Sequence, residues 1–132
     1  MSRILLDTSA YSGLLRGDAR IARAVQEADL IAINAIVLGE LKAGFSRGGH
    51  RERNEKELVE FLSSPRVRVF SVDEETADRY SVILSSLRSA GTPVPTNDVW
   101  IASSAMQHGL RVVTTDRHFR AISQILVDWF GS

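Results

Sequence analysis

The sequence contains no cysteine among its 132 residues. This absence rules out thiolate metal sites, disulfides and cysteine nucleophiles, and it agrees with a reducing compartment. A chain of this length can bury roughly 68–70% of the surface that it exposes when unfolded, so it needs no covalent crosslinks. We therefore expect a single domain, residues 1–132, located in the cytoplasm.

Long apolar runs are also missing. No segment approaches the roughly 18 consecutive apolar residues of a membrane-spanning helix. The apolar run Ile4–Leu6 near the N-terminus stops at the acidic Asp7, which is too early for the apolar region of a signal peptide. The sequence therefore predicts a protein without a membrane partner.

Neither sign of charge dominates. The 16 basic and 16 acidic residues give a formal net charge of zero, which is not typical of a uniformly basic nucleic-acid-binding domain. Only Lys42 and Lys56 are lysines, and the other basic residues are arginines, which pair bidentately with phosphate and stack on bases. High use of arginine codons is one explanation of this bias, and an acidic site ringed by arginines is the other.

Short apolar runs alternate with helical patterns along the chain, which indicates β–α–β units and a parallel sheet. Gly48 and Gly49 end one helical pattern, and Gly91 with Pro93 ends another. The expected fold class is α/β: a three-layer α/β/α domain with a five-stranded parallel sheet. The predicted strands are 4–6, 30–33, 67–72, 111–114 and 125–129, and the predicted helices are 10–16, 18–28, 34–45, 51–62, 73–90, 97–108 and 117–122.

Two acidic residues directly follow predicted strands. Asp7 comes after Ile4–Leu6, and Asp116 comes after the run Val112–Thr115. Right-handed crossovers place the carboxyl ends of parallel strands at one edge of the sheet, where such folds bind ligands. Both carboxylates are therefore site candidates, although each could instead only cap the helix that follows it.

Two further acids lie on the apolar faces of predicted helices. Glu40 shares a helix face with Ile36, and Asp98 shares a face with Ile101. Burying an isolated carboxylate is costly, so each of these groups must be paired, protonated or bound to a metal. A salt bridge to a buried arginine is the alternative for Glu40. For Asp98 a capping role is weak, because Asn97 or Thr96 can cap the helix instead.

Several carboxylates gathered at one sheet edge would repel one another. At an effective dielectric constant of 20, two like charges about 4 Å apart repel by roughly 4 kcal/mol. A bound cation would offset this repulsion, and oxygen ligands without a histidine or cysteine cage suit Mg²⁺ or Mn²⁺. Carboxylates that leave metal positions open to water and phosphate oxygens suit phosphodiester hydrolysis. The predicted metal-binding and catalytic residues are Asp7, Glu40, Asp98 and Asp116.

Four short motifs carry these acids in order along the chain. They are Asp7-Thr8-Ser9, Asn34 followed by Val37-Leu38-Gly39-Glu40-Leu41, Asn97-Asp98-Val99-Trp100-Ile101-Ala102, and Thr114-Thr115-Asp116-Arg117-His118-Phe119. Each motif alone is weak, but the ordered and spaced set resembles the PIN-domain ribonucleases over essentially the whole chain. The likeness is greatest to the VapC toxins of bacterial toxin–antitoxin pairs.

This resemblance implies a metal-dependent endoribonuclease in which the four acids hold Mg²⁺ or Mn²⁺. It implies that Ser9 and Thr115 supply hydroxyls that assist the metal site or its water, with Thr8 as an alternative to Ser9. The implied partners are a structured cellular RNA cut in a single-stranded loop, a cognate antitoxin that inserts a segment near the acidic edge, and a second copy of the chain. Apolar stripes on the helices between Asn34 and Ala90 also favour a homodimer.

Other polar and aromatic residues are weaker candidates. Arg47, Arg51 and Arg53 could form an RNA-binding loop, and a solvated connection between two helices is the alternative. His118 is conceivable as a general base, although a capping or packing role fits its position better. Trp129 is expected in the core or an interface rather than as a base-stacking platform.

Two other protein classes also place an aspartate after the first strand. An aspartyl-nucleophile phosphatase normally has a second aspartate two residues later, where this chain has Ser9. Such phosphatases and phospho-acceptor signalling modules both need a late lysine, and no lysine follows Lys56. A non-catalytic PIN-fold binding module would have lost acids, whereas all four remain. These classes are kept as alternatives to the ribonuclease.

Overall fold

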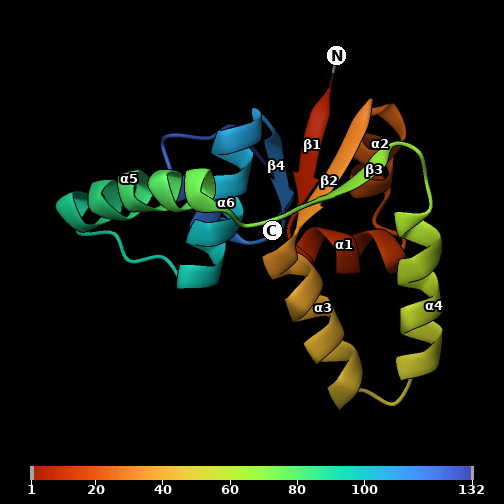
Figure 1. Ribbon diagram of the computed structural model, residues 1–132. Helices are drawn as coiled ribbons and strands as arrows, with labels where there is room; N and C mark the ends of the chain where they lie inside the picture. Colours follow the sequence, from red (N-terminus) through yellow and green to blue (C-terminus); the bar gives the residue numbers. More distant parts are fainter. Residues whose placement is uncertain (1, 132) are drawn as a thin grey trace.

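A parallel sheet lies at the centre of the computed structural model, which describes residues 2–131 (Figure 1). Its five strands are arranged in the order β3-β2-β1-β4-β5, and all four neighbouring pairs are parallel. The predicted α/β fold with a five-stranded parallel sheet is confirmed. The strands are β1 (Arg3–Leu6), β2 (Leu30–Asn34), β3 (Val67–Phe70), β4 (Arg111–Thr114) and β5 (Val127–Trp129).

Helices connect the strands and cover the sheet. Several of them begin at a polar cap: the side chain of Asn34 accepts a hydrogen bond from the N–H of Val37, and Asp73 forms a capping box with Thr76. The α-helices are α1 (Thr8–Leu15), α2 (Ala19–Glu27), α3 (Ala35–Arg47), α4 (Arg51–Leu62), α5 (Glu74–Ala90) and α6 (Thr96–His108), and a 3₁₀ helix η1 covers Arg117–Ala121. Among residues 2–131, no helix combines the length and the apolar character needed to cross a membrane.

The structure corrects some predicted boundaries. Helix α1 begins at Thr8 rather than at residue 10, because Asp7 caps it through the N–H of Ala10. Strand β3 stops at Phe70 rather than at residue 72, because its partner β2 ends at Asn34, opposite Phe70. Strand β5 covers only 127–129, paired with the last three residues of β4.

The most buried strands are the three at the middle of the sheet. Leu5 of β1, Ile33 of β2 and Val112 of β4 are fully buried, whereas the edge strands β3 and β5 are only partly covered. The chain runs outward from β1 through β2 to β3 and then returns to place β4 on the other side of β1. This reversal makes a crevice at the carboxyl ends of β1 and β4, the position at which open parallel sheets bind ligands.

Two helical pairs flank that crevice. Helices α3 and α4 form an antiparallel hairpin that extends beyond the carboxyl edge of the sheet, and α5 lies beside α6 on the other side (Figure 1). Helix α1 follows β1 directly and lies between α3 and α4 in this view (Figure 1). The first turns of α1 and α6, the second turn of α3 and the end of β4 therefore supply the side chains at this edge.

Candidate functional site

Asp7 is the most enclosed acid at the carboxyl edge, with 4% of its surface exposed. Its carboxylate accepts hydrogen bonds from the N–H of Ala10 (2.8 Å), the hydroxyl of Ser9 (2.8 and 2.9 Å) and the hydroxyl of Thr114 (2.6 Å). Burial raises the pKa of Asp7, and the negative charge of Asp116 adds to this, against the lowering effect of the hydrogen bonds. Asp7 therefore caps α1 and is also close enough to Asp116 for the two charges to interact.

Glu40 projects from α3 toward the same edge. The hydroxyl of Thr8 donates to its Oε1 (2.6 Å), and the side-chain amide of Asn97 donates to its Oε2 (3.2 Å). Within residues 2–131 no arginine or lysine forms an ion pair with Glu40, so the salt-bridge alternative is not what the structure adopts. Asn97 does not cap α6 either, since the capping residue is Pro95, without a side-chain hydrogen bond.

Asp98, in the first turn of α6, has a side chain that is only 13% exposed. Its Oδ2 is buried and has no hydrogen-bond partner among the described residues. Burial raises the pKa of Asp98 to about 7, and the nearby carboxylates of Asp116, Asp7 and Glu40 add to this effect. Asp98 is therefore the point at which the charges of all four acids converge.

Asp116 follows β4 and caps η1 by accepting a hydrogen bond from the N–H of His118 (2.9 Å). Although burial acts to raise the pKa of Asp116, hydrogen bonds from the N–H and ring of His118 and from Asp98 lower it. The pKa of Asp98 is thus raised while that of Asp116 is lowered, so Asp98 is the acid of the two that takes up a proton more readily. The pair titrates as one coupled group.

Three hydroxyls lie among these acids. Ser9 Oγ contacts both oxygens of Asp7 and accepts from the N–H of Thr115 (3.1 Å). The hydroxyl that donates to Asp7 from the end of β4 belongs to Thr114, whereas Thr115 reaches the cluster through its backbone. The hydroxyl role expected of Thr115 stays a prediction. Thr8 and Ser9 do not compete for one position, because Thr8 holds Glu40 and Ser9 holds Asp7.

The ring of His118 faces the acids, a position that the sequence does not predict. Its Nδ1 lies 2.7 Å from Asp116 Oδ1 and 3.8 Å from Asp98 Oδ2. One ligand atom from each of these three residues lies within 4.8 Å of the other two, a spacing that can hold a metal ion. The expected capping role belongs to the backbone N–H of His118 and does not account for the contact of the ring with Asp116.

A cavity of about 500 Å³ opens beside Asp116 and His118. Two arginines, Arg16 and Arg117, line it together with Trp129. The sequence pattern does not predict a role for these arginines, although the position of Arg117 directly after Asp116 is a usable signal. Phosphate groups bind well to arginine, so the cavity offers phosphate-binding groups next to the acids.

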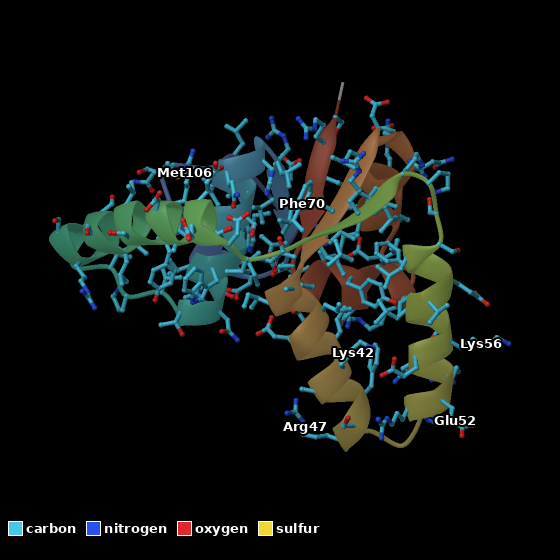
Figure 2. The ribbon with its side chains drawn as sticks, viewed as in Figure 1. Lys42, Arg47, Glu52, Lys56, Phe70 and Met106 are labelled. Atoms are coloured by element: carbon cyan, nitrogen blue, oxygen red, sulfur yellow. The ribbon has the colours of Figure 1, made fainter. Side chains whose placement is uncertain are left out.

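The arginines proposed from the sequence lie elsewhere. Figure 2 shows Arg47 at the end of α3 that is remote from the sheet. Seven residues of helix, about 10 Å at 1.5 Å per residue, separate it from Glu40. Arg51 and Arg53 are exposed at the start of α4, and across residues 2–131 none of the three arginines joins an ion pair. Their part in RNA binding stays a prediction.

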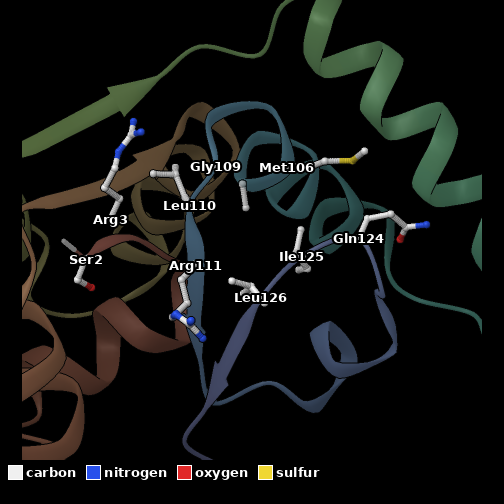
Figure 3. Close-up of a pocket in the computed structure, with 10 residues that line it drawn as sticks. Ser2, Arg3, Met106, Gly109, Leu110, Arg111, Gln124, Ile125 and Leu126 are labelled. Carbon is white, nitrogen blue, oxygen red and sulfur yellow. The ribbon is translucent and has the colours of Figure 1, made fainter.

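Another cavity, of about 460 Å³, lies at the opposite edge of the sheet (Figure 3). Arg3 and Arg111, the first residues of β1 and β4, contribute to its wall together with Leu110 and Ile125. Within the described part of the chain, no carboxylate lines it. The chemistry predicted from the sequence therefore belongs to the carboxyl edge and not to this cavity.

The residues at the carboxyl edge fit a divalent cation. Asp98 Oδ2 is a buried acceptor without a donor, and such an atom requires either a proton or a cation. Carboxylate oxygens are the ligands that Mg²⁺ and Mn²⁺ prefer. Hydrogen bonds from Thr8, Ser9 and Thr114 hold the carboxylates of Glu40 and Asp7 without neutralising them. Both charges act on the pKa of Asp98, but neither residue is in the group of Asp98, Asp116 and His118 whose ligand atoms lie within 4.8 Å of one another. The cluster can therefore bind a metal.

Comparisons with known proteins agree with this geometry. The sequence-family model of the PIN domain matches residues 4–125 of this chain. Ribonuclease VapC4 of Mycobacterium tuberculosis is 30% identical over 95 residues, covering 72% of this chain and 73% of that protein. Ribonuclease VapC2 of Rickettsia felis is 30% identical over 99 residues, covering 74% and 72%.

A solved structure extends the likeness to nearly the whole fold. The DNA-bound VapBC complex of Salmonella typhimurium contains a chain that superposes with a TM-score of 0.83 at 30% identity, covering 97% of this chain and 98% of that one. The range matched by the family model includes the strands and helices that carry the four acids. The chain belongs to the PIN-domain family, and the relatives that it matches there are VapC ribonucleases.

Proposed function

We propose that this protein is a metal-dependent endoribonuclease and the toxin of a VapBC-type toxin–antitoxin pair. It hydrolyses phosphodiester bonds of cellular RNA in the cytoplasm. One observation carries the proposal: the charges of Asp7, Glu40 and Asp116 all act on Asp98, whose Oδ2 is buried without a partner among the described residues. Similarity to proteins named ribonucleases supports the same activity.

The residues proposed to hold the metal are Asp7, Glu40, Asp98 and Asp116. When bound, Mg²⁺ or Mn²⁺ activates a water and stabilises the charge on phosphate oxygens. The cavity beside Asp116 places Arg16 and Arg117 where they can bind the RNA backbone. The chain thus combines a negative centre with positive groups at its rim, as the zero net charge allows.

The chain's own residues prepare the centre in two ways. Hydrogen bonds from Ser9 and Thr114 fix Asp7, and those from Thr8 and Asn97 fix Glu40, so these carboxylates keep their direction without a cation. Asp98 is about half protonated at neutral pH in the metal-free protein, because burial and three neighbouring acids raise its pKa to about 7. Loss of that proton makes a further oxygen available as a ligand.

The proposed partners follow from the relatives. The superposed chain belongs to a complex titled VapBC and bound to DNA, and we propose that this chain likewise binds a cognate antitoxin near its acidic edge. We also propose a homodimer. Val59 of α4 and Val82 of α5 are 65% and 50% exposed, which leaves apolar surface for association.

The two alternatives are less consistent with these contacts. A non-catalytic PIN-fold binding module has no need to keep four acids in mutual repulsion, which destabilises the fold without a compensating role. An aspartyl-nucleophile phosphatase has an acid where Ser9 binds both oxygens of Asp7 here. A metal-dependent nuclease gives each of the four acids a role.

The test is cleavage of an RNA with single-stranded loops by the purified protein in Mg²⁺, in Mn²⁺ and in EDTA. We expect cleavage only with metal, and we expect Asp98→Asn to abolish it. Asp78→Asn is the matched control, because Asp78 is an exposed helical aspartate of α5 remote from the cluster in the chain. Cleavage that persists in EDTA, or in Asp98→Asn, would overturn the metal-site assignment.

A further inference from the structure

The ring of His118 is not explained by capping or packing. Its backbone N–H already satisfies the cap at Asp116, and this needs no particular side chain. The side chain is 42% exposed, and within residues 2–131 it stacks on no aromatic ring. Yet Nδ1 is held 2.7 Å from Asp116 Oδ1, on the side of the ring that faces the acids.

The position of Nδ1 matches that of a ligand atom. Metal–ligand distances of about 2.0–2.2 Å place two ligands of one octahedral ion roughly 2.8–3.1 Å apart when adjacent and roughly 4.0–4.4 Å apart when opposite. The separations from Nδ1 to Asp116 Oδ1 and Asp98 Oδ2 are 2.7 and 3.8 Å. The second of these oxygens is the buried atom that has no partner. One ion can therefore contact both carboxylates and the imidazole with little side-chain movement.

We propose that His118 Nδ1 is a ligand of the divalent cation held by Asp98 and Asp116, and that this nitrogen makes the site prefer Mn²⁺ to Mg²⁺. This inference rests on the proposed metal-dependent function. Mg²⁺ binds oxygen almost exclusively and gives up water reluctantly, whereas first-row transition metals accept imidazole. As a ligand, His118 is neutral, with its proton on Nε2, which faces away from the ion.

A positioning role is the competing explanation. Through the contact at 2.7 Å, His118 would orient Asp116 without binding the ion itself, and Asp116 would be the ligand. His118→Asn separates the two roles, because an asparagine amide can still donate to Asp116 but supplies no imidazole nitrogen. A positioning histidine would leave the choice between metals unchanged, whereas a ligand would not.

The experiment measures metal binding without RNA. Calorimetric titrations with Mn²⁺ and Mg²⁺ give both affinities, and electron spin echo envelope modulation of the Mn²⁺-loaded protein detects directly bound nitrogen. His50→Asn is the control, since His50 is exposed before α4 and its side chain makes no capping hydrogen bond. For the parent and the control we expect nitrogen modulation and tighter binding of Mn²⁺ than of Mg²⁺.

For His118→Asn we expect the nitrogen modulation to disappear and the Mn²⁺ affinity to fall by at least about tenfold, with Mg²⁺ affinity changed much less. Asp98→Asn should lose affinity for both metals. If the parent binds Mn²⁺ without nitrogen modulation, or if His118→Asn keeps the parent's metal preference, the ligand role is refuted while the proposed nuclease stands. A parent that binds neither metal would refute both.

Discussion

Replacing Asp98 by asparagine should stabilise the metal-free protein above pH 7 and destabilise it relative to the parent once metal is added. Burial and the charges of three other acids raise the pKa of Asp98 to about 7 in the folded chain, from an ordinary value of 3.8. Ionised Asp98 therefore carries a penalty that a neutral asparagine of the same shape lacks. Asparagine can also donate a hydrogen bond to Asp116, as protonated Asp98 does.

The size of the effect follows from the same difference. A change from 3.8 to about 7 corresponds to roughly 4 kcal/mol of unfolding free energy, at about 1.36 kcal/mol per pH unit. Part of this free energy is offset, because the pKa of Asp116, the acid that interacts with Asp98, is lowered in the folded protein. Removing an acid from the first turn of α6 costs about 0.3–1 kcal/mol more. We expect a net gain of about 1–3 kcal/mol, or roughly 3–10 °C in melting temperature.

The dependence on pH has a defined sign. Between about pH 4 and pH 7 the folded parent holds a proton on Asp98 that the unfolded chain has released. The stability of the parent therefore falls as pH rises through this window, and the penalty is fully present above pH 7. The advantage of Asp98→Asn should grow over the same window and should be absent below about pH 4, where Asp98 is protonated in both states.

The assay is a set of melting curves for the parent, Asp98→Asn and the control Asp78→Asn at pH 4, 6 and 8, in EDTA and in Mn²⁺. Metal at a hundred times its Kd adds about 2.7 kcal/mol to a parent that binds it only when folded, and it should add much less to Asp98→Asn. Equal stabilisation of both proteins by Mn²⁺ would show that Asp98 is not in the metal site. Asp98→Asn melting below the parent in EDTA at pH 8 would refute the electrostatic reasoning.

Three further outcomes are expected. Induction in a bacterium without the antitoxin should arrest growth, and Asp7→Asn, Glu40→Gln or Asp116→Asn should each abolish the arrest while the protein stays soluble; full toxicity of all three would contradict the site. The logarithm of the RNA-binding constant should fall by about 0.7 per unit of log salt concentration for each phosphate neutralised. The double variant Arg16→Ala with Arg117→Ala should bind RNA more weakly. Arg51→Ala with Arg53→Ala tests the arginines of the α3–α4 hairpin, and unchanged affinity would show that they are only solvated. Light scattering at micromolar concentration should report a dimer, and a monomer alone would count against the exposed valines of α4 and α5 as an interface.

Local sequence patterns were sufficient for the elements, whereas the metal-binding role of the four acids stays a prediction. Apolar runs, caps and glycine stops predicted the five strands and the helices, because these signals act over a few residues. The rule that parallel strands end at one edge placed Asp7 and Asp116 together, and the cost of burying charge singled out Glu40 and Asp98. Small errors arose where a cap or a pairing partner set the boundary, as at Thr8 and Phe70.

Only the tertiary structure decided which side chains complete the site. Thr114 and Thr115 are adjacent in the sequence, but only one can point from β4 toward Asp7, and this depends on the orientation of the strand in the sheet. The ring of His118 meets Asp98, 20 residues away, and Arg16 meets Arg117 at one cavity, because β4 pairs with β1. A sequence records what each residue can do nearby, whereas contacts between distant residues depend on how the packed elements are arranged.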